Sequence, residues 1–314
     1  MTAEQIQSIA DAGAFPGPDQ PVSLVETHIS WVVLTPEYAF KIKKPVRFGF
    51  LDFSTLEKRA NYCSEEVRLN KRLAPHMYLG VLPIGNPRNQ PTIGDSTTPA
   101  IDYAVHMRRM DNRRQMDILL AENRVTSHHL ERLAITLADF HREVVLEGPI
   151  AYHPGAYWAD FAELYSLHPD IDRHLGTAAN SQLKRWRKSL PVFLEQHAAR
   201  LIERVRLGFW VDGHGDLHAR NIFLPEDGEP VIFDCIEFNP HFRQLDILNE
   251  LAFLCMDMEA AGHPELAKSF ITTYTAQWDV FPKPEDQQLF LFFKAYRANV
   301  RLKIALLELR QHPS

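Results

Sequence analysis

The feature that most constrains this chain is a polar loop followed by a short apolar hairpin. Residues 214–221 read His-Gly-Asp-Leu-His-Ala-Arg-Asn, and two apolar runs then flank the turn Pro-Glu-Asp-Gly at 225–228. Apolar runs on both sides of a glycine-containing turn predict a β-hairpin. Such a hairpin would bring Asn221 and Asp234 together at its open end, with Asp216 on the loop that leads into it.

An Asp, an Asn and a second Asp in this order are typical of phosphoryl-transfer sites. The first carboxylate orients or deprotonates the attacking hydroxyl, while the Asn and the second Asp hold Mg²⁺ on the phosphates of a nucleotide. We therefore predict Asp216 and His214 as the catalytic residues, with Asp216 at the hydroxyl and His214 bracing the loop. Asn221 and Asp234 are the predicted Mg²⁺ ligands.

The same loop also allows a different class of site. His214, Asp216 and His218 alternate, so on a strand they would share one face, and such a face could bind Zn²⁺ for hydrolysis. Gly213 and Gly215 favour a loop instead, and no second His-rich stretch supplies further ligands. A turn whose His and Asp bond only backbone groups is the third alternative.

The order of these motifs resembles the aminoglycoside phosphotransferase family, a branch of the protein-kinase-like fold. The resemblance rests on His-x-Asp-x4-Asn at 214–221 followed by Ile-Phe-Asp at 232–234. The phrases His-Gly-Asp-Leu-His and Phe-Asp-x-Ile-Glu-Phe-Asn, at 214–218 and 233–239, are similar to a bacterial group described as aminoglycoside-phosphotransferase-like enzymes. Some members of that group carry an added P-loop kinase domain. No Gly-x4-Gly-Lys-Ser/Thr stands in this chain, so we expect that domain to be missing.

The resemblance implies an α+β fold with two lobes, a small antiparallel-sheet N-lobe and a larger, mostly helical C-lobe. A nucleotide-binding lobe over 1–108 and a catalytic and acceptor-binding lobe over 109–314 are expected. Met107 and Met110 frame the implied linker, whose backbone would meet the adenine ring. The implied activity is Mg²⁺-dependent transfer of the γ-phosphoryl of ATP or GTP to a hydroxyl of a small metabolite or an aminoglycoside-like acceptor. A nucleotide-binding regulatory protein without turnover is the alternative on the same fold.

A lysine that contacts the α- and β-phosphates is a further implication of the resemblance. The runs 22–25, 29–34 and 38–43 read as strands, and Lys41 and Lys43 fall on one face of the last of them. We favour Lys41 because it lies deepest in the apolar run, whereas Lys43 is expected at the exposed end of the strand. No Gly-rich phosphate loop precedes these strands, which argues against a protein kinase.

A helix follows, and it carries the predicted partner of the lysine. Ser54 and the Glu three residues later form a capping box, and the helix that it opens is expected to reach Leu73. Glu66 falls on the apolar face of that helix and needs a partner, because an unpaired buried carboxylate is costly. The strand lysine would supply the partner, as in the Lys–Glu pair of kinases. Glu65 is the alternative, but it shares a solvated face with Arg68.

The remaining segments are predicted from periodicity and carry weaker functional signals. Glu237 is expected near Asp234, in contact with the metal or acceptor or behind them, and Asp246 is given a structural role. His141 is predicted to be a core histidine with a backbone partner. Strands are predicted at 79–84 and 100–107, and helices at 3–13, 127–145, 156–206, from 245, 264–278 and 285–310; Tyr152, Tyr157 and Trp158 are candidates for the acceptor pocket.

Composition excludes several classes of protein. A net charge of -6 and a pI near 6.2 give no global attraction to nucleic acid or anionic membranes. No apolar run is long enough to span a bilayer, and the first residues lack the pattern of a signal peptide. Three widely spaced cysteines indicate reduced thiols. We therefore expect a cytoplasmic enzyme whose partners are a nucleotide and a small hydroxyl acceptor, with neither nucleic acid nor membrane.

Overall fold

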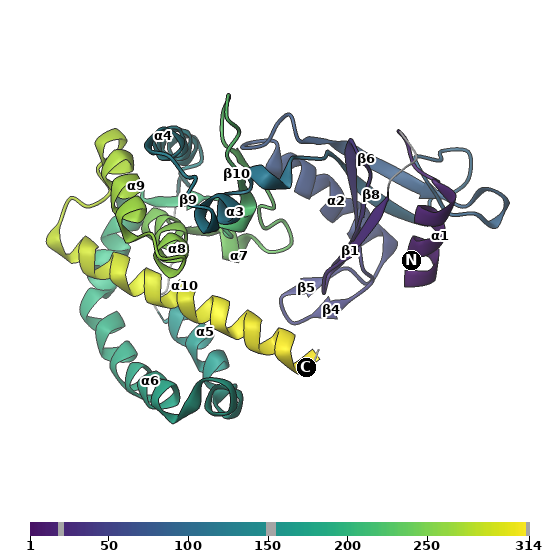
Figure 1. Cartoon of the computed structure of the whole chain (residues 1–314). Coiled ribbons are helices and arrows are strands. Elements are labelled where there is room, and N and C mark those ends of the chain that lie inside the picture. Colours follow the sequence, from purple (N-terminus) through teal and green to yellow (C-terminus); the bar gives the residue numbers. More distant parts are fainter. Residues whose placement is uncertain (18–21, 149–154, 312–314) are drawn as a thin grey trace. The chain divides into compact units, whose positions relative to one another are not determined.

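The computed structural model describes residues 1–17, 22–148 and 155–311 (Figure 1). Within this part the chain forms two compact units. Unit 1 comprises Met1–Arg124, His214–Asp216 and Arg220–Arg243, and unit 2 comprises Val125–Gly213, Leu217–Ala219 and Gln244–Ser314. These units are defined by packing, and the functional division expected after residue 108 stays a prediction.

Unit 1 is built on an antiparallel sheet of six strands in the order β1-β2-β3-β8-β6-β7. The central strand β3 pairs with β2 on one side and with β8 on the other, so that Lys41 lies between Val32 and Val105. The strands are β1 (Ser23–Glu26), β2 (Ser30–Leu34), β3 (Tyr38–Lys43), β6 (Tyr78–Gly85), β7 (Thr92–Ile93) and β8 (Asp102–Arg108).

The two faces of β3 differ because successive side chains of a strand point to opposite sides. Phe40 and Ile42 enter an apolar core with Ile6 and Ile9 of α1 (Ala3–Ala12). The opposite face carries Ala39, Lys41 and Lys43, and it is covered by α2 (Leu56–Asn70). The helices α1 and α2 thus lie on opposite faces of the sheet (Figure 1). One face of β3 is therefore a core and the other is available for charged groups.

The start and the end of α2 differ from the prediction. The N-cap is Thr55, whose hydroxyl accepts a hydrogen bond from the Lys58 amide at 3.2 Å, so the capping box predicted at Ser54 is placed one residue too early. Ser54 instead donates to the Asp52 carboxylate at 2.5 Å. The helix also ends at Asn70 rather than at Leu73. Glu66 nevertheless keeps its place on the buried face.

Unit 1 also contains short elements outside the six-stranded sheet. Two of them form the predicted hairpin, β10 and β11, and another hairpin, β4–β5, had no counterpart in the sequence analysis. These elements are β4 (Arg47–Phe48), β5 (Leu51–Asp52), α3 (Met116–Ala121), β10 (Ile222–Phe223), β11 (Val231–Ile232) and α7 (Pro240–Arg243), with 3-10 turns at Pro87–Asn89, Asn112–Arg114 and, shared with unit 2, Ala219–Asn221.

Unit 2 is mostly helical, as expected for the C-lobe. Its most apolar helix, α8, is buried on all sides along most of its length and packs against α9 and α10, while α4 packs against α9. Its elements are α4 (Ser127–Glu143), α5 (Ala156–Tyr165), α6 (His168–Arg206), β9 (Trp210–Asp212), β12 (Gln244–Asp246), α8 (Ile247–Ala260), α9 (Pro264–Gln277) and α10 (Pro284–Gln311). The predicted α+β class is therefore confirmed.

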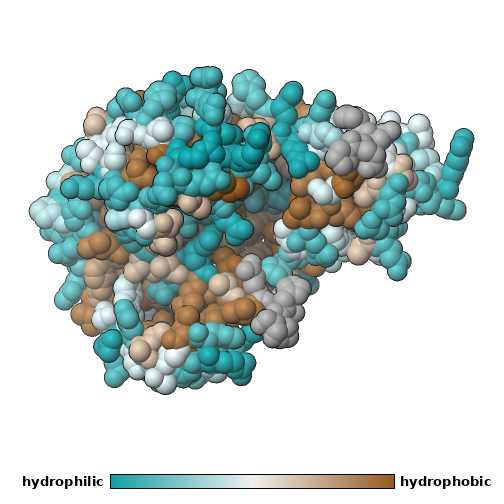
Figure 2. All heavy atoms as spheres, in the orientation of Figure 1, coloured by the Kyte–Doolittle hydropathy of each residue, from teal (hydrophilic) through white to brown (hydrophobic). Residues whose placement is uncertain are grey.

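The surface carries many polar residues, which agrees with the moderate net charge of the chain. The face shown in Figure 2 is largely hydrophilic, with smaller hydrophobic areas between the polar ones. Among the described helices, none is both long enough and apolar enough to span a membrane.

Candidate active site

The open end of the β10–β11 hairpin brings together two of the predicted site residues. Ile222 pairs with Ile232 in the antiparallel register, and the Phe233 amide donates to the Asn221 carbonyl at 3.0 Å. Asp234 is the next residue along the chain. The structure thus places Asn221 beside the start of the Asp234 segment, as the sequence predicts.

Asp234 has an unusual backbone conformation for a residue other than glycine. Its φ is 64°, in the left-handed region. Two side chains hold this conformation: the Tyr78 hydroxyl accepts from the Asp234 amide at 3.2 Å, and the Asn70 side chain accepts from the Cys235 amide at 2.9 Å. The Asp234 side chain is 44% exposed. Strained backbone of this kind persists only where its surroundings fix it, and it is concentrated at functional sites.

His214 connects the loop to the same segment. Its Nε2 lies 2.8 Å from the Phe233 carbonyl oxygen, and its own carbonyl accepts from the Ile236 amide at 3.1 Å. A carbonyl can only accept, so Nε2 carries the proton, and Nδ1 can accept from the Asp216 amide at 3.3 Å. The histidine therefore braces the loop as predicted, through backbone groups. Its classification as catalytic stays a prediction.

Gly215 is required by the path of the loop. Its φ is 83°, and a Cβ atom at this position would lie 2.8 Å from the carbonyl oxygen of Phe242. Any side chain would push the loop away from α7. The glycine between His214 and Asp216 is thus a steric requirement of unit 1.

A separate network supports the residue before the loop, in unit 2. A Cβ atom on Gly213 would lie 2.2 Å from Oε2 of Glu250. Glu250 is buried and bonds Nε2 of His141 at 2.9 Å, while Nδ1 of His141 lies 2.8 Å from the Tyr274 hydroxyl. His141 is therefore a core histidine, as predicted, but its partners are side chains and not the backbone, because two helices supply polar groups at this depth.

Asn221 and Asp216 contact each other directly. The amide nitrogen of Asn221 donates to the carbonyl of Asp216 at 3.0 Å and to its carboxylate at 3.2 Å. This use of the nitrogen leaves the amide oxygen of Asn221 as its ligand atom. Hard cations such as Mg²⁺ prefer oxygen ligands and need few protein groups, because phosphates and water complete the coordination. The oxygens of Asn221 and Asp234 fit such an ion.

The zinc alternative does not fit the described residues. Among them, no three His, Cys, Asp or Glu side chains are grouped so that they could hold a metal ion. His214 is also turned toward the backbone of Phe233. The cluster of His214, Asp216 and His218 that the hydrolase hypothesis requires is therefore not formed there.

The predicted contact between Lys41 and Glu66 is present. Lys41 Nζ lies 2.8 Å from Oε1 of Glu66 and 2.6 Å from Oδ1 of Asp234. Burial by itself would raise the pKa of Glu66, but the ammonium groups of Lys41 and Lys43 outweigh it and lower that pKa. Glu65, the alternative partner, is instead paired with Arg68 on the surface.

Lys43 departs from the prediction. It was expected at the exposed end of its strand, but its side chain is only 1% exposed. Its Nζ donates to Oε2 of Glu66 at 2.5 Å and also bonds Glu237. The expectation failed because β3 stays paired as far as Lys43, opposite Ser30, and because the Glu237 that binds it is distant in sequence.

The two methionines predicted near the adenine ring lie in an apolar cluster of unit 1. Met107 is buried beside Ala39, Val105 and Phe223, and Met110 is partly buried against the same cluster. Phe223 comes from the hairpin, so this cluster connects the sheet with the hairpin that leads to Asp234. The contact of Met107 and Met110 with a nucleotide stays a prediction.

Comparison with known proteins now identifies the family. The model of the phosphotransferase enzyme family, APH, matches residues 40–283 of this chain. The chain belongs to that family. The match covers most of the sequence and includes the predicted site residues from Lys41 to Asp234, so the family resemblance of the sequence motifs is confirmed.

Relatives of this phosphotransferase-family chain include longer proteins. The uncharacterized protein Rv2004c of Mycobacterium tuberculosis is 32% identical over 306 residues, which cover 95% of this chain and 57% of that protein. The uncharacterized protein Mb2027c of Mycobacterium bovis matches to the same extent. The chain thus spans about 57% of the length of these relatives.

Solved structures of other kinases and phosphotransferases show a similar fold at low sequence identity. A choline kinase from Cryptosporidium parvum Iowa II is 12% identical with a TM-score of 0.52, covering 98% of this chain and 90% of that one. Spectinomycin phosphotransferase, solved with ADP and spectinomycin, is 11% identical with a TM-score of 0.51, covering 96% and 85%. The fold is therefore kinase-like, with an antiparallel-sheet N-lobe and a helical C-lobe.

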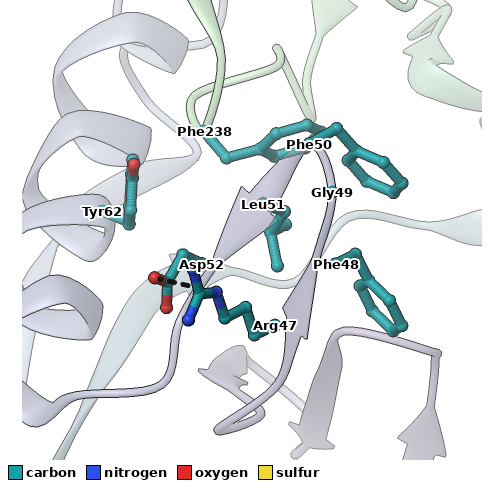
Figure 3. A pocket seen from close by; sticks show the side chains of 8 residues that line it. All are labelled: Arg47, Phe48, Gly49, Phe50, Leu51, Asp52, Tyr62 and Phe238. Carbon is teal, nitrogen blue, oxygen red and sulfur yellow. Dashed lines mark ion pairs between the residues drawn. The ribbon is translucent and has the colours of Figure 1, made fainter.

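An aromatic pocket adjoins the end of the Asp234 segment and was missed in the sequence. The cavity measures about 530 Å³ and is lined by the β4–β5 hairpin, Tyr62 and Phe238 (Figure 3). The rings of Phe48 and Phe50 stack with centres 5.9 Å apart, and Phe50 also contacts Phe238 at 5.9 Å. The phrase Phe-Gly-Phe at 48–50 was the available signal, since it places two aromatics around a turn residue.

The aromatics proposed for an acceptor pocket in unit 2 are not supported as a group. Tyr157 is buried and packs edge-on against Phe292 and Phe293, which makes it part of the core. Trp158 follows it on α5, and Tyr152 lies outside the described residues.

Proposed function

We propose that this chain transfers the γ-phosphoryl group of ATP or GTP to a hydroxyl group of a small molecule, with Mg²⁺. One observation carries the proposal: Lys41 bonds both Glu66 and Asp234. A lysine held by a helix glutamate is the cation that neutralises nucleotide phosphates, and an Asp at this position holds the metal on them. Both groups meet at one point of unit 1.

The nucleotide end of the site would be formed by six residues. Lys41, held by Glu66, would contact the phosphates, and Met107 and Met110 would line the place of the adenine. Asp234 would hold Mg²⁺ together with Asn221. The bound ion would supply the positive charge that stabilises the phosphates as charge develops on them.

The acceptor end of the site would depend on Asp216. Asn221 donates to its carboxylate, so the carboxylate is held in one orientation. From there it would accept the proton of the attacking hydroxyl, or orient that hydroxyl in line with the phosphate. His214 would keep the loop in place through Phe233 and Ile236.

The acceptor we propose is a small metabolite or an aminoglycoside-like compound. The choline kinase and the spectinomycin phosphotransferase named above act on small molecules with hydroxyl groups, which supports this class. We expect the reaction to take place in the cytoplasm, and neither nucleic acid nor a membrane has a part in it.

Nucleotide binding is the first test. We expect ATP or GTP to raise the melting temperature of the purified chain, and to raise it further with Mg²⁺, because a ligand that binds only the native state stabilises it. Asp234→Ala should still fold, and adding Mg²⁺ to the nucleotide should no longer raise its melting temperature further. An Mg²⁺ effect of wild-type size in that variant would remove Asp234 from the metal site.

Turnover is the second test, since it separates an enzyme from a binding protein. Transfer of γ-labelled phosphate to a panel of sugars, amino alcohols and aminoglycosides would establish the kinase. Mg²⁺-dependent nucleotide binding with no transfer to any compound would indicate a regulatory nucleotide-binding protein. Stabilisation by Zn²⁺ alone, without nucleotide binding, would indicate a hydrolase.

A further inference from the structure

The ion network of unit 1 contains one pair that the proposed function does not use. Lys43 and Glu237 bond each other, and both side chains are almost fully buried. Removing two charges from water is costly, so a buried ion pair is weak evidence for stability. The location of this pair, directly behind the site, points to another role.

The pair repeats the Lys41–Asp234 contact further along the same two segments. Lys41 and Lys43 lie two residues apart on one face of β3, and Asp234 and Glu237 lie three residues apart. Glu66 links the two lysines. Its Oε1 accepts from Lys41 at 2.8 Å, and its Oε2 accepts from Lys43 at 2.5 Å. The segment 234–237 is therefore attached to β3 at both ends.

The charges of this network do not balance within it. Lys41 and Lys43 carry two positive charges, whereas Glu66, Glu237 and Asp234 carry three negative charges. Asp234 is the exposed member. If Asp234 turns to a bound cation, the four groups that remain are two ammoniums and two carboxylates.

Lys43 supplies the second positive charge that makes this balance possible. Without it, Lys41 alone would face the buried carboxylates of Glu66 and Glu237, and their attraction would hold it away from the phosphates. The position of Lys43 is fixed by a third contact, since its Nζ lies 4.8 Å from the centre of the Phe53 ring. Glu237 is likewise fixed, because the Ile236 amide before it is bonded by the His214 carbonyl.

We propose that Lys43 and Glu237 are positioning residues that hold the Asp234 carboxylate in place for the metal. The inference rests on the proposed function of Asp234 and Lys41. The pair anchors the end of the segment that begins at Asp234, and it neutralises the buried charge that would otherwise compete for Lys41. Neither residue touches the nucleotide.

The test measures how strongly Mg²⁺ enhances nucleotide affinity. Calorimetric titrations with ATP, with and without Mg²⁺, give this enhancement as a ratio of dissociation constants for the wild type, Glu237→Gln, Lys43→Arg and the double variant Lys43→Met/Glu237→Gln. We expect Glu237→Gln to bind metal-free ATP within about threefold of the wild type and to lose roughly 10-fold or more of the enhancement, the usual effect of removing a partner behind a metal ligand.

The remaining variants separate charge from geometry. Lys43→Arg keeps the charge and should retain more of the enhancement than Glu237→Gln does. The double variant removes both charges, so it should fold even if the single loss of Lys43 prevents folding. Its loss of enhancement should be close to that of Glu237→Gln alone, because the two residues act as one unit.

A matched control comes from another buried pair of unit 1. Arg59 Nε donates to Asp102 at 2.9 Å, and both side chains are nearly fully buried. Asp102 also pairs with the N-terminal ammonium of Met1 at 3.2 Å, and among the described residues no ion pair links these groups to the network. Asp102→Asn should lower the melting temperature and leave the Mg²⁺ enhancement unchanged.

The outcomes distinguish the two proposals. If Glu237→Gln and Asp102→Asn both lower the melting temperature while the enhancement stays at the wild-type value, Lys43 and Glu237 are only structural and the inference fails. If the wild type itself shows no Mg²⁺ enhancement, the proposed function fails and the inference fails with it.

Discussion

Two buried charge networks, one in each unit, use similar numbers of charged groups in different ways. In unit 1, two lysines meet Glu66, Glu237 and Asp234, and the last of these is exposed. In unit 2, two arginines meet two aspartates. Arg204 forms a two-point contact with Asp246 at 2.7 and 2.9 Å, and Arg200 forms one with Asp286 at 2.8 and 2.6 Å.

The difference between lysine and arginine explains what each network is suited for. A guanidinium is a planar fork that fits a carboxylate in one geometry, whereas an ammonium is a point charge that can exchange partners. In the unit 2 network the two arginines and two aspartates at the centre are buried. Its exposed carboxylate, Glu203, is paired with both Arg200 and Lys283, so positive and negative charges are equal in number. The unit 1 network has a surplus carboxylate at its exposed end. We infer that the first is a fixed support and the second is able to accept a cation.

The largest expected effect concerns a site residue outside both networks. Asp216→Asn keeps the size of the side chain and removes its charge, so phosphoryl transfer should fall roughly 10²–10⁴-fold. ATP affinity should stay within a few-fold of wild type, because Asp216 is assigned to the acceptor. Steady-state rates and calorimetry on the same preparation check both. An equal fall in ATP affinity would move Asp216 to the nucleotide side.

The next effect should appear in stability alone. Arg204→Met leaves the buried carboxylates of Asp246 and Asp286 without a shared partner, and breaking a buried pair in this way typically costs about 3–5 kcal/mol. Urea unfolding measures this loss. If the variant folds, its Mg²⁺ enhancement of ATP affinity should match the wild type; a clear fall there would mean that the unit 2 network also serves the site.

A double-mutant cycle tests the network of unit 1. Lys41→Ala and Glu66→Ala should each weaken turnover, and together they should lose less than the sum, with a coupling energy of about 0.5–3 kcal/mol for residues in contact. Additive losses would show that the 2.8 Å contact between Lys41 and Glu66 does not contribute to turnover. A large effect at Lys43 with none at Lys41 would exchange the roles of the two lysines.

The smallest effect concerns the exposed edge of the unit 2 network. Glu203 pairs there with Lys283 and is 41% exposed, close to the exposure of Asp234. Glu203→Gln should shift the melting temperature by no more than about 2 °C, because exposed ion pairs contribute little. A shift as large as that of Arg204→Met would contradict this.

The pH dependence of that small effect has a definite sign. Lys283, followed by Arg200, lowers the pKa of Glu203 below its usual value. Its contribution to stability is therefore present above that usual value and is lost as the pH falls through the lowered pKa. Melting curves of the wild type and Glu203→Gln should converge under acidic conditions and separate at neutral pH.

The sequence predicted the parts of the site that depend on local patterns. The hairpin with Asn221 and Asp234, the strand with Lys41 and the buried place of Glu66 follow from periodicity, turn residues and the cost of an unpaired carboxylate. The capping of α2 was misplaced by one residue, because Ser54 and Thr55 are both good N-cap residues and the choice depends on the Asp52 contact.

The features that the sequence did not predict depend on contacts between segments far apart in the chain. Lys43 and Glu237 are 194 residues apart, and nothing in either local pattern indicates the partner. The left-handed backbone of Asp234 was also missed, since it is fixed by Asn70 and Tyr78 from other elements and no glycine marks it. Periodicity predicts which face is buried, but not which charged groups meet there.

The backbone of Asp234 has a consequence for protein engineering. Apart from glycine, only Asn and Asp enter the left-handed region with ease, so few residues suit this position even before chemistry is considered. Glycine offers no ligand atom, and asparagine offers no charge. A saturation library at position 234, ranked first by melting temperature and then by phosphoryl transfer, should therefore place Gly, Asn and Asp above Ala and the other residues in the first ranking, and Asp alone at the top of the second. Two independent filters converge on one amino acid at this position.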